Sequence, residues 1–448
     1  MGHDPGDDEG WRVMGRRTAW GRGTAVAVLL WAATAPVSWS ASAVGTADTS
    51  YAFAADATSV DGATGTADAR PLDAGKSYRS SLPKAAKLYY RLDLDESSNA
   101  YVSVTAVPRA GGGKLTVSDG IRVSVQNADS HPCSYESANF GSSGSPRPLT
   151  AWGARTTSPP TPLCTGSGAY YVVVERVGTA DSAAGTWDLE LTTATEPALT
   201  RTGATSAPGA WDSASPEPLT GEARSRSGGA GFSRAASIDQ GVWRTGISPG
   251  QTLYYRVPVD WGRRLSATVD LGGGGAGGAG AGGAGYAVDA LNVSLYNPVR
   301  AEVADANTGY DGTQQSASLA PLPPVAYANR YARNNTKVNG MRFAGSYYLA
   351  VHLSAGVADD FGDGPFDLTL RVRVSGTAQE GPGYAGQPVP GDLFTITAAD
   401  RRAAAQGDTG SDDTTMEALA VGGLGAGTVV LVVLGVWTVV GRRRAGAV

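Results

Sequence analysis

The sequence Leu88-Tyr-Tyr-Arg-Leu-Asp-Leu-Asp95 occurs a second time in the chain as Leu253-Tyr-Tyr-Arg-Val-Pro-Val-Asp260. In the first copy, Leu88, Tyr90 and Leu92 alternate with Tyr89, Arg91 and Asp93. An alternation with a period of two is typical of a strand that buries one face. The second copy keeps this alternation, so the two segments are predicted to be equivalent half-buried strands.

Further segments recur in the same order around this pair. The matches are Tyr78–Ser80 with Trp243–Thr245, Val102–Val104 with Ala267–Val269, Asp119–Asn127 with Asp289–Asn297, Gly168–Glu175 with Gly345–His352, and Trp187–Leu191 with Phe366–Leu370. Turn-rich connections separate these segments, and none of the connections has a helical period of useful length. The pattern predicts an all-β chain with two jelly-roll-like antiparallel β-sandwich domains.

The motifs of the two copies resemble those of bacterial pre-peptidase C-terminal (PPC) domains. The shared order is LYYR-hydrophobic, D-x-hydrophobic-x-V-S-hydrophobic-x-N, G-x-Y-Y-hydrophobic-x-V and aromatic-D-L-x-L, over residues 70–193 and 236–375. The resemblance implies tandem PPC-like β-sandwiches in a membrane-anchored surface protein of actinobacterial type. Because these motifs are core and turn positions, they imply a fold and no chemistry.

The N-terminal residues have the pattern of a secretory signal peptide. Four arginines (Arg12, Arg16, Arg17 and Arg22) precede the uncharged stretch Gly23–Ala35, and Ala41-Ser42-Ala43 follows with the small residues that signal peptidase needs. Met14 is an alternative start. Export by the general secretory route fits better than the twin-arginine route, because the residues around Arg16-Arg17 match the latter weakly.

The C-terminal residues have the pattern of a membrane anchor. Leu419–Val440 is uncharged, and at 1.5 Å per residue it is about 33 Å long, enough for a hydrocarbon core of about 30 Å. Arg442, Arg443 and Arg444 follow, and such a cluster stays in the cytoplasm. The prediction is a single-pass type I protein of the cell membrane with an extracytoplasmic ectodomain.

The predicted organisation has eight parts. They are a signal peptide (1–43), an N-terminal segment (44–69), a first sandwich (70–193), a Ser/Pro/Gly-rich linker (194–235), a second sandwich (236–375), a stalk (376–418), a transmembrane helix (419–440) and a basic cytoplasmic tail (441–448). The formal net charge is −5 and the tail is basic, so the exported part is acidic. This disfavours a nucleic-acid partner.

Few residues suggest chemistry. Cys133 and Cys164 are the two cysteines of the chain, and outside the cell they are predicted to form a disulfide. Asp359, Asp360 and Asp363 form a carboxylate cluster that suits Ca²⁺, although the ligand pattern is incomplete and a solvated turn is favoured. No other cofactor is predicted.

A Tyr/Arg surface is a candidate binding site. Tyr89 and Arg91 lie on the outward parity of their strand, and Tyr254 and Arg256 occupy the equivalent positions. Such residues are common in binding hot spots and could hold a sugar or a peptide, but cross-strand pairing on an exposed face is the favoured explanation. His352 has the same outward parity and is predicted to be a surface residue.

These observations predict a non-enzymatic surface protein that binds or scaffolds an extracytoplasmic protein or polysaccharide. One alternative is an accessory subunit of an envelope secretion or protease system. A second, less favoured, is a hydrolase that uses carboxylates gathered in one cleft. The strand parities place Asp93, Asp95 and Glu175 outward on separate segments, which does not favour the hydrolase.

Overall fold

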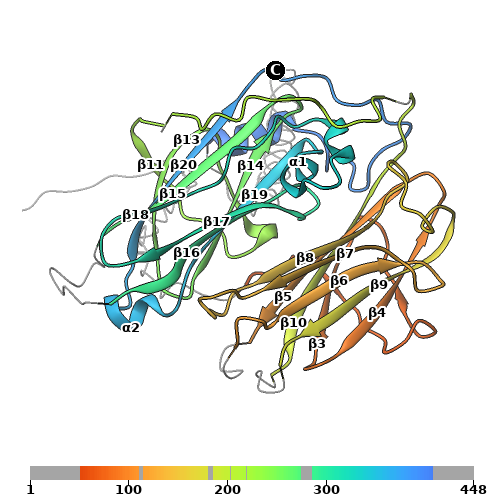
Figure 1. Cartoon of the computed structure of the whole chain (residues 1–448), viewed down its shortest axis with the longest axis horizontal. Coiled ribbons are helices and arrows are strands. Elements are labelled where there is room, and N and C mark those ends of the chain that lie inside the picture. Colours follow the sequence, from red (N-terminus) through yellow and green to blue (C-terminus); the bar gives the residue numbers. More distant parts are fainter. Residues whose placement is uncertain are drawn as a thin grey trace, which may run out of the picture. The chain divides into compact units, whose positions relative to one another are not determined.

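Four five-stranded sheets make up the fold in the computed structural model of the chain (Figure 1). The structure describes residues 51–109, 115–179, 185–201, 203–217, 219–273 and 285–406. Within these residues the sheets form two β-sandwiches in tandem, which confirms the all-β prediction. The predicted signal peptide, the membrane anchor Leu419–Val440 and the cytoplasmic tail lie outside the described residues.

The first sandwich is formed by sheets 1A and 1B. Sheet 1A has the order β1 (Thr58–Ser59), β3 (Ser77–Leu82), β10 (Trp187–Glu196), β5 (Asn99–Pro108) and β8 (Leu149–Arg155). Sheet 1B has the order β2 (Arg70–Pro71), β4 (Lys87–Leu94), β9 (Gly168–Val177), β6 (Gly120–Gln126) and β7 (Pro132–Asn139). The two-residue strand β1 pairs in parallel with β3, and β2 pairs in parallel with β4. All other neighbouring strands in the two sheets are antiparallel.

The second sandwich is formed by sheets 2A and 2B. Sheet 2A has the order β11 (Ala223–Ser225), β13 (Gly241–Ile247), β20 (Phe366–Ser375), β15 (Arg264–Leu271) and β18 (Gln315–Ser318). Sheet 2B has the order β12 (Ala236–Ser237), β14 (Thr252–Val259), β19 (Gly345–Leu353), β16 (Ala287–Tyr296) and β17 (Glu302–Tyr310). As in the first sandwich, the short strands are parallel to their neighbours: β11 pairs with β13, and β12 pairs with β14.

The two sandwiches correspond strand for strand. Strands β1 to β10 and strands β11 to β20 take the same places in their sheets, so the repeat found in the sequence is a repeat of structure. The two LYYR segments are β4 and β14. Strand β4 pairs with β9, and β14 pairs with the equivalent strand β19. The sequence comparison missed β7 and β8 with their counterparts β17 and β18, as well as the four two- or three-residue strands.

The core of each sandwich lies between its two sheets. Leu88, Tyr90 and Leu92 are buried as their alternation predicts, and they pack with inward residues of sheet 1A such as Leu189. Fully burying a side chain of this size contributes about 1.5–3 kcal/mol. The equivalent residues of β14 are buried in the core of the second sandwich.

Buried ion pairs join the two sandwiches. Glu196, on the outer face of sheet 1A, pairs with Arg330 of the second sandwich at 2.6 Å, and both side chains are almost fully buried. Tyr101, Tyr384 and Asn99 also donate hydrogen bonds to this carboxylate. Burial alone would raise the pKa of Glu196, but the charge of Arg330 and these hydrogen bonds lower it. A buried carboxylate is tolerated when an ion pair and hydrogen bonds satisfy it in this way.

A second ion pair lies further along the same face of β10. Glu190 pairs with Arg300 at 2.6 Å, and it accepts hydrogen bonds from the hydroxyl of Tyr51 and the backbone N–H of Ala54. Arg300 lies in the turn between β16 and β17, at the end of sheet 2B. The outer face of sheet 1A is therefore attached to the second sandwich at two separate points.

Three predicted connecting segments take part in the fold. The N-terminal segment (44–69) contributes β1, and the linker (194–235) contributes the end of β10 and all of β11. In the predicted stalk, Val389 pairs with Thr195 through two backbone hydrogen bonds, and Phe394 stacks on Phe343 with ring centroids 4.7 Å apart. Over its described part, 376–406, this segment therefore lies on the sandwiches and is not a free stalk.

The described residues contain short helices only. These are η1 (Phe232–Arg234), η2 (Tyr327–Tyr331), α1 (Thr336–Gly340), α2 (Val357–Phe361) and α3 (Ala398–Gln406). None of them has the length and apolar character that a membrane crossing requires.

Candidate functional site

The predicted disulfide is present. Cys133 on β7 and Cys164, in the segment before β9, are bonded and buried in the core of the first sandwich. The second sandwich has no counterpart, as the sequence shows. The bond closes a loop that contains the whole of β8, and its role is structural.

Tyr89 and Arg91 lie on the outer face of sheet 1B. Tyr89 is half-buried opposite Val173 of β9, and the ammonium group of Lys87 lies 5.7 Å from its ring centroid. Arg91 is 3.2 Å from Asp93, and its side chain is 41% exposed. This half of the predicted surface is open to solvent, and Arg91 is paired along the strand while Lys87 is paired with Glu175 of β9.

Tyr254 and Arg256 have different surroundings. Tyr254 is only 2% exposed, because Tyr51 and Phe232 pack edge-on against its ring at centroid distances of 5.9 and 5.0 Å. Arg256 donates a hydrogen bond to the hydroxyl of Ser237. The chain's own residues thus cover the equivalent surface of the second sandwich, and the structure does not bring the two Tyr/Arg pairs into one site.

The prediction that His352 is a surface residue is wrong. His352 is 2% exposed, and its ring nitrogens lie 3.0 Å from the Thr252 hydroxyl and 2.9 Å from the Ser145 hydroxyl. Burial, with a contribution from the charge of Arg147, lowers the pKa of His352 to about 3. A turn of the first sandwich covers this side chain, and the outward parity of the strand gives no sign of that contact.

The three predicted calcium ligands do not form a metal site with one another. Asp359 and Asp360 are exposed in the first turn of α2, and Asp363 is exposed beyond its end. Among the residues that the structure describes, no group of three or more His, Cys, Asp or Glu side chains is arranged to hold a metal ion. The calcium hypothesis gains no support from this arrangement.

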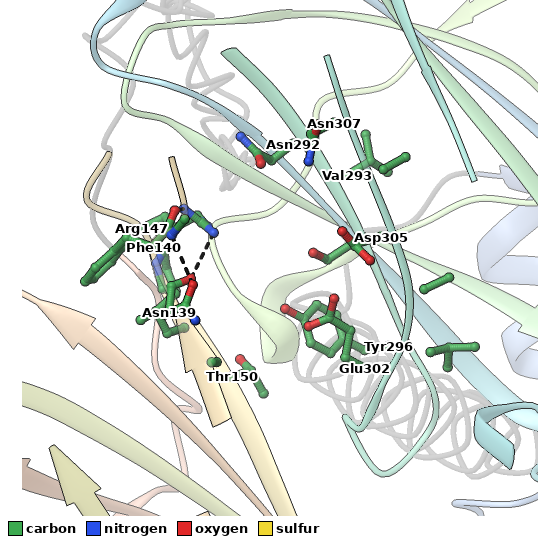
Figure 2. A pocket seen from close by; sticks show the side chains of 18 of the residues that line it. Asn139, Phe140, Arg147, Thr150, Asn292, Val293, Tyr296, Glu302, Asp305 and Asn307 are labelled. Atoms are coloured by element: carbon green, nitrogen blue, oxygen red, sulfur yellow. Dashed lines mark hydrogen bonds between the residues drawn. The ribbon is translucent and has the colours of Figure 1, made fainter. Parts of the chain in front are cut away.

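A polar groove lies between the two sandwiches, and we consider it the candidate functional site (Figure 2). Its volume is about 450 Å³. Figure 2 shows Asn139, Phe140 and Arg147 of the first sandwich on one side, and Tyr296, Glu302 and Asp305 of the second on the other. Both sandwiches therefore supply its walls.

Strand pairing places the polar residues on the second sandwich's wall. In β16, Val293 and Leu295 point into the core, so the alternating residues point outward. The register of β16 and β17 sets Asn292 beside Asn307, Ser294 beside Asp305 and Tyr296 beside Glu302. These three cross-strand pairs form a continuous polar strip on the outer face of sheet 2B.

The opposite wall comes from the end of β7 and the start of β8. Glu136 and Asn139 belong to β7, and Thr150 to β8. Arg147 is held in place, because its guanidinium donates hydrogen bonds to the carbonyl oxygens of Phe140 and Asn139 at 2.6 and 3.2 Å. The dashed lines in Figure 2 mark these two bonds.

The groove raises the pKa of two glutamates in its lining, Glu302 and Glu136. Burial, with the like charges of Asp305 and Glu136, raises the pKa of Glu302 to about 7, and Arg147 offsets part of this effect. Burial also raises the pKa of Glu136. An acid that titrates near neutral pH inside a groove is a common feature of functional sites.

Sequence reasoning missed this groove. Of its strands, β7, β8 and β17 lie outside the repeated segments, and only β16 belongs to one of them. The sequence did mark Asp289 as equivalent to Asp119, and Asp289 lines the groove. Yet the groove exists only because the sandwiches pack together, and no repeat or motif encodes that packing.

No protein-family model and no curated protein matches the sequence. The chain is similar to the pre-peptidase C-terminal domain of a Bacillus anthracis collagenase, with 15% identity, 28% of this chain and 94% of that chain covered, and a TM-score of 0.19.

Two further solved structures show the same level of similarity. The N-terminal CBM22-1–CBM22-2 tandem domain of Paenibacillus barcinonensis Xyn10C has 11% identity, 68% and 92% coverage and a TM-score of 0.15. The ANX1 ectodomain from Arabidopsis thaliana has 11% identity, 70% and 92% coverage and a TM-score of 0.17. TM-scores this low do not establish a shared fold, and no function follows from these similarities. The PPC resemblance remains a prediction, and the sandwich fold rests on the sheets themselves.

Proposed function

We propose that the chain is a non-enzymatic, extracytoplasmic binding protein whose ligand occupies the groove between the two sandwiches. The observation that carries this proposal is that both sandwiches line the groove while buried ion pairs, Glu196 with Arg330 and Glu190 with Arg300, hold them together. Because the walls are held in place before binding, less conformational entropy is lost when a ligand binds.

The proposed location is the cell surface. Residues 1–43 would direct export, and Leu419–Val440 would anchor the chain as a single-pass type I protein with its C-terminus in the cytoplasm. The Cys133–Cys164 disulfide supports an oxidising compartment. The ligand would be an extracytoplasmic protein or polysaccharide, and no nucleic acid is proposed as a partner.

A groove-blocking variant tests this proposal. The full-length protein in detergent micelles is applied to arrays of peptides and glycans, next to Asn307→Trp, which places a large ring in the groove from an exposed position. Ser81→Trp is the matched control, since Ser81 is exposed on β3 and does not line the groove. We expect capture that Asn307→Trp abolishes and Ser81→Trp retains. Equal capture by both variants would contradict the proposal.

One observation favours the hydrolase as a second candidate. Distant segments do bring carboxylates into one groove, where Glu302 has a pKa of about 7 beside Asp305. Acid–base catalysis uses such pairs. Incubating the intact protein with arrayed polysaccharides and peptides separates the two functions. Product that forms with the native chain and not with Glu302→Gln would establish catalysis.

A further inference from the structure

Carboxylates line both walls of the groove. Glu136 comes from β7 of the first sandwich, and Asp289, Glu302 and Asp305 come from β16 and β17 of the second. The basic residues of the lining are Arg147 and Lys337. Like charges that face each other across a cavity destabilise the unliganded protein, so a structural role alone does not explain them.

The surrounding protein offsets the charge of these carboxylates only in part, through Arg147. No ion pair and no side-chain hydrogen bond joins Glu136, Glu302 or Asp305 to another of the described residues. The guanidinium of Arg147 is committed to two backbone carbonyls, and Lys337 is exposed on α1. The acids therefore keep their hydrogen-bonding capacity for a ligand.

We propose that the groove binds an organic cation, and that Glu302 and Asp305 accept hydrogen bonds from its ammonium or guanidinium group. This inference rests on the proposed function and names the ligand chemistry of the same site. A bare metal ion is a poorer fit, because no metal-holding cluster occurs among the described residues. The volume of about 450 Å³ leaves room for the aliphatic stem of a long cation.

The inference links binding to pH. Glu302 has a pKa of about 7 in the unliganded groove. The groups that face it are Asp305 on its own strand, Glu136 on β7, Tyr296 and Asp289 on β16, Arg147 before β8 and Lys337 on α1. A bound cation favours the ionised carboxylate, so binding near pH 7 releases protons and affinity increases from pH 6 to pH 8.

Isothermal titration calorimetry of the full-length protein in detergent micelles tests the inference. The probes are an acetylated and amidated tri-arginine peptide and spermidine, which distinguish a peptide source from a polyamine source. The same peptide with citrulline in place of arginine has nearly the same shape without the charge. We expect at least one cationic probe to bind at pH 8 and to bind about tenfold more weakly at pH 6, whereas the citrulline peptide does not bind.

Two variants and a control locate the effect. Glu302→Gln and Asp305→Asn should each weaken binding about tenfold or more, since hydrogen bonds to charged groups are the strong ones. Glu302→Gln should also remove most of the pH dependence. Asp93→Asn changes an exposed carboxylate of sheet 1B outside the groove lining and should bind like the native chain. Thermal unfolding confirms that each variant is folded.

The outcomes separate this inference from the proposed function. Equal binding of the arginine and citrulline peptides, or unchanged affinity in both acid variants, would overturn the cation site. Capture of an uncharged glycan that Asn307→Trp abolishes would also overturn the cation site while retaining the groove as the binding site. If Asn307→Trp changes no capture at all, both proposals fail.

Discussion

Strands β4 and β14 share the sequence LYYR and the same place in their sheets, yet the first tyrosines of these segments have opposite surroundings. Tyr89 is half-buried on an open face, and Tyr254 is 2% exposed beneath Tyr51 and Phe232. The covering residues come from outside the strands of the repeat. The repeat therefore determines which side chains point outward, and the segments around it determine whether that outer face remains free.

The largest expected effect comes from breaking the buried ion pair between Glu196 of the first copy and Arg330 of the second. Arg330→Met leaves Glu196 buried without its ion-pair partner and should lower the free energy of unfolding by about 3–5 kcal/mol. Chemical denaturation of the full-length protein measures this loss. Adding Glu196→Gln to Arg330→Met should restore much of the stability, and a double variant as unstable as the single one would count against the ion-pair account.

The tyrosine pair gives the next effect. Tyr254→Ala removes a buried ring from an aromatic cluster and should cost about 3 kcal/mol, whereas Tyr89→Ala should cost less than about 1 kcal/mol. The two variants are matched in residue type, strand and position. Equal losses in denaturant midpoint would mean that the outer face of sheet 2B is as open as that of sheet 1B.

The disulfide is a further difference between the copies, because only the first sandwich has one. Replacing both Cys133 and Cys164 by serine should cost about 3.7 kcal/mol by the chain-entropy estimate for a separation of 31 residues. Amide hydrogen exchange should show the loss of protection in β6 to β9 and little change in β16 to β19. Uniform loss of protection in both sandwiches would show that they unfold as one unit.

A smaller effect is expected at His352, whose copy-one equivalent is the half-buried Glu175. The pKa of His352 is about 3 in the folded chain and about 6.5 when unfolded, so the unfolded state binds more protons in between. Its contribution to stability is complete above pH 6.5 and decreases below it by up to about 1.4 kcal/mol per pH unit. His352→Gln should flatten the denaturation profile between pH 7 and pH 5, whereas His131→Gln, at an exposed position, should leave it unchanged.

The sequence predicted what depends on local pattern. The alternation in β4 and β14 identified the inward residues, the matched segments identified the repeat, and the two cysteines identified the disulfide. The contact between the sandwiches was not predictable, because it depends on single residues such as Arg300, Arg330 and Phe232 that lie outside the repeated segments. For the same reason the groove was not predictable, and neither was the burial of His352, which Ser145 of the first sandwich contacts.

The packing of the first sandwich onto sheet 2B is the claim on which the groove depends. Hydroxyl-radical footprinting of the native full-length protein, read by mass spectrometry, tests it most directly. The structure predicts that Tyr89 and the 71% exposed Tyr135 are oxidised rapidly, while Tyr254 and Tyr296 are oxidised only after unfolding. Oxidation of Tyr296, which lines the groove, at the rate of Tyr89 in the native protein would contradict that packing, and the groove with it.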